Sequence, residues 1–166
     1  MSSSDLSSSS SVDEAFVQVG QQGGVRTLWL NRPRQFNPLS EGMLDALEAA
    51  LADAAQDASV RCIVLAAHGK AFCAGHDLRE MRSQYRKDYY LELFNRCGRT
   101  MQSLQQLPVP VIARVQGIAT AAGCQLVASC DLAVAVDSAR FAVSGINVGL
   151  YCSTPAVALT RNVSRK

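Results

Sequence analysis

The sequence lacks a long hydrophobic run, a strong charge of either sign and the residue spacings of a metal centre. Its apolar runs are only a handful of residues long, far below the roughly 20 that span a bilayer, so we expect no membrane span. The 16 basic and 14 acidic side chains give a net charge of +2, which argues against binding to nucleic acid. With no CxxC pair and only 2 histidines, the 6 cysteines do not predict a zinc site.

The sequence does contain enough apolar material for one ordinary domain. A chain of 166 residues, 48% of them hydrophobic, buries roughly 70% of its unfolded surface and needs no disulfide to be stable. We therefore interpret the cysteines as mostly buried free thiols. Residues 1–14 are rich in serine and are predicted to form a disordered tail, so the folded part is expected over residues 15–166.

Strand and helix patterns alternate along the folded part, which predicts an α/β fold with largely parallel strands. The first two strands read as a hairpin with its turn at residues 20–24. Ser40 is a suitable N-cap for the first helix, and Pro108 stops the second. The other segments are read as loops at residues 31–38 and 67–78, strands at residues 15–19, 25–30, 61–66, 111–115 and 131–136, and helices at residues 88–107, from about residue 121, and near the end of the chain.

Two glycine-marked junctions connect a strand to a helix, AFCAGHDL and QGIATAAGCQL. Both are predicted at the carboxyl ends of parallel strands, where ligands bind in α/β folds. In a functional interpretation, the backbone N–H groups of His76 and Ala122 converge on an oxygen that gains negative charge, as in an oxyanion hole. In the alternative, these small residues only let helix and strand pack closely, and the spacing alone favours neither.

Four longer segments form a specific set when taken in order: LNRPRQFNPLS, KAFCAGHDLREM, LPVPVIARVQGIATAAGCQLVASCDLAVA and SARFAVSGINVGL. Their order and separations resemble those of the crotonase superfamily, the enoyl-CoA hydratases and isomerases. The resemblance implies a spiral of repeated β-β-α units that binds an acyl-CoA thioester, with coenzyme A as part of the substrate and no separate cofactor. It also implies a homotrimer or hexamer for the full-length family.

The resemblance places specific roles on the two junctions. The family's oxyanion donors fall on the backbone N–H groups of His76 and Ala122, which a change of side chain does not remove. The two glutamates that activate and deliver water in the hydratases fall on Gln125 and Gly145. Because neither residue titrates near neutral pH, we do not expect conventional hydration.

For the coenzyme A end, the resemblance implies two kinds of contact. Arg34 and Arg79 occupy positions suited to phosphate, which the planar guanidinium binds with two hydrogen bonds. Backbone atoms around Phe36, Pro38 and Ala74 are expected to hold the adenine. Asp77 is expected to accept backbone N–H bonds that shape its loop.

The family continues beyond the end of this sequence, so residues 15–166 resemble the N-terminal portion of a crotonase-like domain, truncated before the C-terminal helical region. We therefore expect partly uncovered apolar faces on the strands that begin at Arg61, Val111 and Asp131 and on the helix at Ala121. The resemblance also implies fatty-acid metabolism in the mitochondrion; since the N-terminus has no clear transit peptide, a cytoplasmic location stays open.

Two classes of function remain at this point. In the first, the chain is an enzyme that acts on an acyl-CoA through thioester polarisation alone, as an isomerase, a hydrolase or a weak hydratase. In the second, it is a non-catalytic acyl-CoA-binding or regulatory subunit, or an incomplete and inactive chain.

Overall fold

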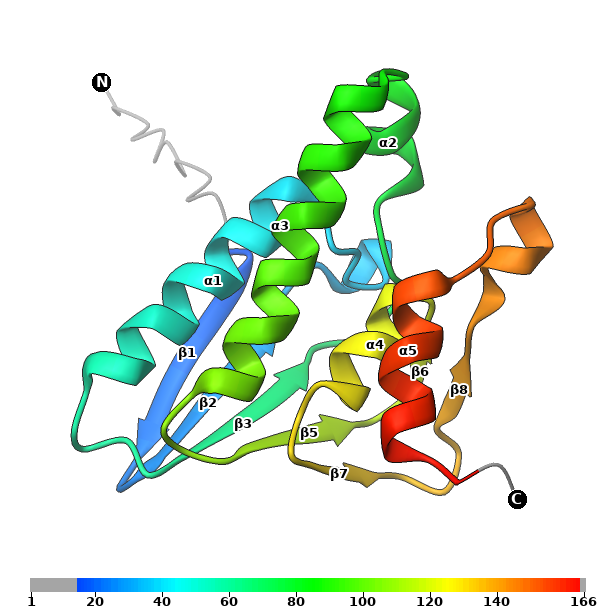
Figure 1. Cartoon of the computed structure of the whole chain (residues 1–166). Helices are drawn as coiled ribbons and strands as arrows, with labels where there is room; N and C mark the ends of the chain where they lie inside the picture. Colours follow the sequence, from blue (N-terminus) through cyan, green and yellow to red (C-terminus); the bar gives the residue numbers. More distant parts are fainter. Residues whose placement is uncertain (1–14, 165–166) are drawn as a thin grey trace, which may run out of the picture.

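A computed structural model describes residues 15–164 of the chain (Figure 1). The elements in chain order are β1 (Val17–Gln22), β2 (Val25–Leu30), the 3-10 turn η1 (Pro33–Gln35), α1 (Glu41–Gln56), β3 (Cys62–Ala67), β4 (Ala71–Cys73), α2 (Leu78–Ser83), α3 (Lys87–Gln106), β5 (Val111–Val115), β6 (Ile118–Thr120), α4 (Ala122–Ala128), β7 (Leu132–Ala135), β8 (Arg140–Ala142), η2 (Ser144–Val148) and α5 (Ser153–Asn162). The predicted tail at residues 1–14 and the last two residues of the predicted folded part lie outside the described residues.

The larger sheet has five strands in the order β1-β2-β3-β5-β7. Only β1 and β2 pair antiparallel; β2, β3, β5 and β7 are parallel, so the predicted α/β class is confirmed. The hairpin turn is shorter than predicted. Gly20 pairs with Thr27 inside β1, and the turn consists of Gly23 and Gly24 alone, because Gly23 supplies the positive φ of 56° that a tight turn requires.

A second sheet of three parallel strands, β4-β6-β8, was not predicted. Its strands have three residues each, and they lie in segments that we read as loops or as turn and helix. The short helix α2 was not among the helices predicted from the pattern, which placed only its first residue, Leu78, at the end of a loop. The two glycine-marked junctions therefore follow β4 and β6, and not β3 and β5 as expected.

Helices α1 and α3 cover one face of the larger sheet (Figure 1). The Ser40 hydroxyl accepts a hydrogen bond from the Met43 amide at 3.2 Å, which confirms the predicted N-cap of α1. The opposite end of α1 is held to the hairpin by Arg26, whose guanidinium lies 2.6 Å from the carboxylates of Asp53 and Asp57. The buried core lies between these two helices and strands β2, β3 and β5.

Uncovered apolar faces were expected on four elements. The expectation is correct for β7, correct in part for β3 and β5, and wrong for α4. All four residues of β7 are exposed. On β3 and β5, by contrast, one face is buried, and the other carries the half-buried Val64 and Ile112 and the exposed Arg114. The expectation is wrong for α4, because β4 and α5 pack against it and bury six of its seven residues.

The cysteines are free and differ in burial. Cys73, Cys97 and Cys124 are buried as expected, while the other three, at positions 62, 130 and 152, are half-buried. Burial raises the pKa of both the Cys73 and the Cys97 thiol to about 12, so these groups stay protonated near neutral pH. None of the helices between residues 15 and 164 combines the length and the apolar character needed to cross a membrane.

Candidate functional site

The two glycine-marked junctions lie side by side. Strands β4 and β6 are parallel neighbours, so the turns that follow them meet at the same edge of the small sheet. Gly75 has a φ of +89°, and a Cβ placed on it would lie 3.3 Å from the amide nitrogen of Ala122 and 3.1 Å from the Thr120 carbonyl oxygen. Only glycine suits this position, because it tolerates both the positive φ and the close approach of the second turn.

The second turn is built from a residue in a rare backbone conformation. Ala121 has φ 51° and ψ −124°, which non-glycine residues seldom adopt. Its amide donates to the Ala142 carbonyl at 2.9 Å, which ties the turn to β8. The strained conformation sets the direction in which α4 leaves the sheet, starting at Ala122.

The first turn of α4 packs closely against β4. A Cβ placed on Gly123 would lie 2.2 Å from the Cys73 carbonyl oxygen, so a side chain is excluded there. The amide of Ala122, at the first position of α4, has no intrahelical acceptor. Among the hydrogen bonds of residues 15–164, neither this amide nor that of His76 is a donor to a protein acceptor.

The predicted adenine segment is bonded directly to the first turn. The Ala74 amide donates to the Phe36 carbonyl at 3.0 Å, and the Leu39 amide donates to the Gly75 carbonyl at 2.7 Å. The buried Asn37 strengthens the connection, because its Nδ2 donates to the carbonyls of His68 and Ala71, each at 2.9 Å. The loop at residues 36–39 and the turn at residues 74–76 therefore form one connected unit.

The other predicted coenzyme A contacts lie on elements next to this unit. Arg34 is exposed on η1 and Arg79 is exposed at the start of α2, while Pro38 is buried and Phe36 is half exposed. The α2 start is fixed by Asp77, whose Oδ1 accepts from the amides of Arg79 at 2.9 Å and Glu80 at 3.2 Å. The expectation that Asp77 shapes the loop is thus confirmed.

The His76 side chain is held by its own neighbours. Its Nδ1 lies 3.3 Å from the Leu39 carbonyl oxygen, and the ring edge of Phe94 meets it with 5.3 Å between ring centroids. Burial of the imidazole lowers its pKa below the usual 6.5, an effect that the contact with the Leu39 carbonyl opposes. The side chain is therefore favoured in its neutral form.

Positions 125 and 145 lie in tight surroundings. Gln125 is buried on α4, and its Oε1 accepts a hydrogen bond from the Thr154 hydroxyl of α5 at 2.9 Å. A Cβ placed on Gly145 would lie 2.7 Å from the Leu150 carbonyl oxygen and 2.6 Å from the Cys152 sulfur. A larger side chain at position 145 would require the loop before α5 to move.

Sequence reasoning missed two residues that shape the site, Asn37 and Thr154. Asn37 lies in a segment that was read only as a loop. The available signal was a polar residue between two prolines, Pro33 and Pro38. Thr154 gave none, because its partner on α4 is 29 residues away in the chain. Between residues 15 and 164, no three His, Cys, Asp or Glu side chains come together in a way that would hold a metal ion.

Comparisons with known proteins identify the family of the chain. The family model "Enoyl-CoA hydratase/isomerase" matches residues 20–166. The chain is 53% identical to "Enoyl-CoA hydratase domain-containing protein 3, mitochondrial" of Xenopus laevis over 88% of its own length and 50% of the relative's. The corresponding human protein is 47% identical, over 88% of this chain and 48% of that protein. The chain thus spans about half the length of the curated relatives it matches.

Solved structures share the fold. An enoyl-CoA hydratase of Mycobacterium smegmatis matches with a TM-score of 0.90 and 64% identity, over 92% of this chain and 60% of that one. The human enoyl Coenzyme A hydratase domain-containing protein 3 matches with a TM-score of 0.87 and 46% identity, over 90% of this chain and 59% of that one. The predicted crotonase-type fold is therefore confirmed, and the chain belongs to the enoyl-CoA hydratase/isomerase family.

Proposed function

We propose that this chain binds an acyl-CoA thioester and holds the thioester oxygen between the backbone N–H groups of His76 and Ala122. The observation that carries the proposal is the contact of the two turns, in which the Gly75 Cβ position lies 3.3 Å from the Ala122 nitrogen. A carbonyl oxygen accepts two hydrogen bonds, and two donors without protein acceptors at adjacent turns suit that need.

The coenzyme A part is assigned to the connected unit beside the two turns. Backbone atoms around Phe36, Pro38 and Ala74 would take the adenine, and Arg34 and Arg79 would take phosphates. Support comes from the hydrogen bonds that join Phe36 to Ala74 and Leu39 to Gly75, because they fix the adenine segment relative to the thioester segment. Preorganised contacts of this kind lower the entropic cost of binding.

We further propose that the bound thioester is not hydrated in the conventional way. Positioned acid and base groups each contribute about 10² to 10⁴ to a rate, and the residues assigned to the two glutamate positions, Gln125 and Gly145, supply neither. The second candidate function is catalysis of a reaction that needs only polarisation of the thioester. The two backbone donors could supply it, since they do not depend on side chains. An oxyanion donor contributes about 10² to 10³.

Calorimetry with crotonoyl-CoA and free coenzyme A tests the binding. We expect crotonoyl-CoA to bind more tightly than coenzyme A, and we expect Ala122→Pro to weaken it by about three- to tenfold, the value of one hydrogen bond. Proline is tolerated at the first position of a helix, so the substitution removes the donor with limited damage to α4. Leu78→Pro is the matched control, because it places proline at the first position of α2.

The outcomes of these experiments distinguish the assignments. Equal binding of crotonoyl-CoA and coenzyme A, or equal loss in the two proline variants, would contradict the oxyanion role of Ala122. Binding without product supports the non-catalytic subunit, whereas turnover that disappears in Ala122→Pro supports the polarisation reaction. Hydration at rates normal for the family would show that positions 125 and 145 were wrongly assigned.

The cellular setting is also a proposal. The relatives named above carry "mitochondrial" in their names, and on that basis we propose a mitochondrial protein of fatty-acid metabolism. For the full-length family we expect a homotrimer or hexamer. Fractionation of cells that express the protein tests the mitochondrial location, and sedimentation analysis of a full-length family member tests the oligomeric state.

A further inference from the structure

An open groove lies along the first half of α3 and the turn that precedes it. Its volume is about 400 Å³, and its lining consists of Tyr85, Arg86, Lys87, Tyr90, Leu91 and Phe94. The volume falls within the range of small-molecule sites, about 300–1,000 Å³. The lining combines apolar and aromatic side chains with two cations and contains no acidic residue.

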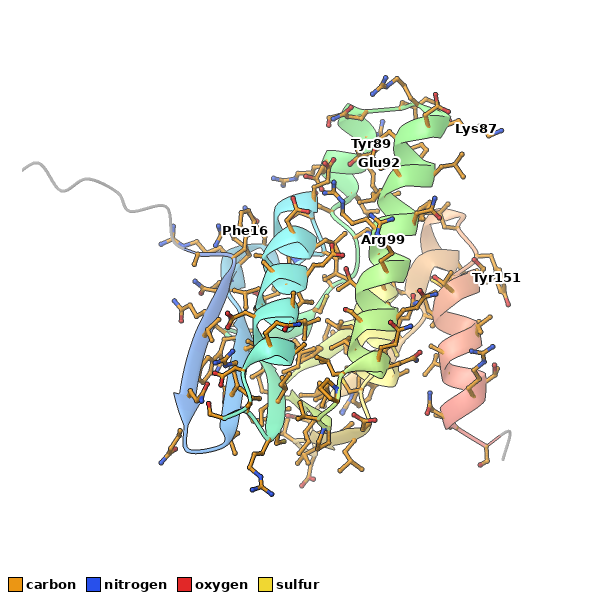
Figure 2. The ribbon with its side chains drawn as sticks, turned by 60° about the vertical axis from the view of Figure 1, so that its left-hand side comes forward. Phe16, Lys87, Tyr89, Glu92, Arg99 and Tyr151 are labelled. Atoms are coloured by element: carbon orange, nitrogen blue, oxygen red, sulfur yellow. The ribbon has the colours of Figure 1, made fainter. Side chains whose placement is uncertain are left out.

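The groove runs lengthwise along α3. Lys87, Tyr90, Leu91 and Phe94 are spaced by three, four and seven residues, so they form one stripe on α3. Seven residues of helix extend over about 10 Å. Figure 2 shows Lys87 at the end of α3 that projects from the molecule, so the cationic end of the groove is the outer end.

The inner end of the groove, at Phe94, lies beside the His76 side chain. The rings of Phe94 and His76 meet in an edge-on arrangement with 5.3 Å between centroids. Tyr90 stacks on Phe94 at 6.4 Å, and its hydroxyl donates to the Met81 carbonyl at 3.0 Å, which fixes the ring. Tyr85 meets Tyr90 at 6.1 Å. A continuous row of rings therefore leads from His76 to the outer end.

The cations at the outer end have no counter-charge of their own. The Arg86 guanidinium donates to a neutral side chain, the Gln84 Oε1 at 3.3 Å. Among residues 15–164, the ion pairs involve Arg26 and Arg96, and neither Arg86 nor Lys87 is paired with a carboxylate. An anion at the end of an apolar chain would find a complementary charge here.

We propose that the groove takes the acyl chain and that Arg86 and Lys87 select chains with a carboxylate at the far end, as in dicarboxylic acyl-CoA thioesters. The apolar stripe receives the methylene groups, and the two cations receive the terminal carboxylate. This inference rests on the proposed function, since it assumes that the thioester lies at His76.

A comparison of decanoyl-CoA and decanedioyl-CoA tests the proposal, because the two thioesters differ only in their terminal group. We expect calorimetry on the full chain to show about fivefold tighter binding of decanedioyl-CoA, the upper value for pairing with exposed cations. The preference should fall as the salt concentration rises, because the charges are solvent-exposed.

Variants on α3 and the turn before it show whether the cations cause the preference. The double substitution Arg86→Gln and Lys87→Gln should abolish the preference, so that decanedioyl-CoA and decanoyl-CoA bind this variant equally. Lys87→Arg should keep it. Arg99→Gln, which removes an exposed charge from the same helix three turns away, is the matched control (Figure 2).

The possible failures are distinguishable. If both thioesters bind equally to the unsubstituted chain, the cationic selection is wrong and the proposed function stands. A preference for decanedioyl-CoA that survives the double substitution also overturns the assignment to Arg86 and Lys87. If neither thioester binds more tightly than free coenzyme A, the proposed function fails, and this inference fails with it.

Discussion

Strands β3 and β7 have similar sequences, CIVLAA and LAVA, and opposite surroundings. Strand β3 lies between β2 and β5 beneath the helices, and its Leu65 is fully buried. Strand β7 is the edge strand, and its Leu132 and Val134 are 62% and 63% exposed. The difference shows that an apolar strand pattern reports what a strand is able to bury, while its neighbours decide whether burial occurs.

The helices show the same contrast. On α4 nearly every residue is buried, whereas on α5 only Pro155 is buried and Val157 is half exposed. Tyr151, just before α5, is 83% exposed and projects from the surface in Figure 2. Exposed apolar side chains, which we call the exposed strip, therefore recur along the chain from β7 through η2 to α5, at residues 132–157. Exposed apolar surface favours association.

The largest expected effect comes from truncation to alanine in each of the two strands. Leu65→Ala should lower the free energy of unfolding by about 2–5 kcal/mol, because it leaves a cavity in the core. Val134→Ala should change it by less than about 0.5 kcal/mol, since the side chain is already hydrated. Urea unfolding monitored by circular dichroism measures both. Equal losses would mean that β7 is covered in solution.

A second pair of substitutions compares close packing with open space. Gly123→Ala should cost about 1–3 kcal/mol, because the new methyl group would meet the Cys73 carbonyl and force α4 away from β4. Gly98→Ala should stabilise the chain by about 0.5–1 kcal/mol, because it lies inside α3 with nothing within 4 Å of its Cβ position. Thermal melts of the two variants should shift in opposite directions.

The helices and long strands were largely predictable from local chemistry. The N-cap of α1 is the predicted Ser40, and α3 differs by one residue at each end from the predicted 88–107. The strands β4, β6 and β8 were missed because three residues contain too little periodicity to reveal a strand. They exist through pairing with one another across more than 40 residues of chain between β4 and β6, which no local pattern records.

For the site, glycines were the informative residues. Close packing of helix and strand was one of the two interpretations of the glycine-marked junctions, and the Cβ positions of Gly75 and Gly123 show that neither tolerates a side chain. The oxyanion roles of His76 and Ala122 stay predictions. The contact between Gln125 and Thr154 could not be anticipated, because it depends on how α5 packs against α4.

A third test addresses the exposed strip. The double substitution Leu132→Lys and Val134→Lys should change the unfolding free energy by less than about 0.5 kcal/mol per site, because both side chains are exposed. It should reduce binding of a hydrophobic dye and reduce self-association in sedimentation experiments. The control, Gln102→Lys with Gln105→Lys, adds the same charge to exposed positions of α3. If both variants act alike, the effect is due to charge and not to the exposed strip.

The smallest expected effect is a pH dependence that arises from the half-buried His76. Burial lowers the pKa of His76 below 6.5 in the folded chain, while the unfolded chain keeps a pKa of about 6.5. Between these two values the unfolded state binds more protons, so stability should rise with pH and level off above about 6.5.

Substitution of each histidine in turn isolates this effect. His76→Gln should flatten the dependence of the unfolding free energy on pH, whereas His68→Gln, at a half-buried position where the imidazole contacts Gln18, should retain it. Urea midpoints between pH 5 and 8 provide the measurement. Glu80 acts in the opposite direction at lower pH, because burial raises the pKa of its carboxyl. The decisive quantity is therefore the difference between the parent chain and His76→Gln, and a difference independent of pH would show that the His76 imidazole is hydrated in solution.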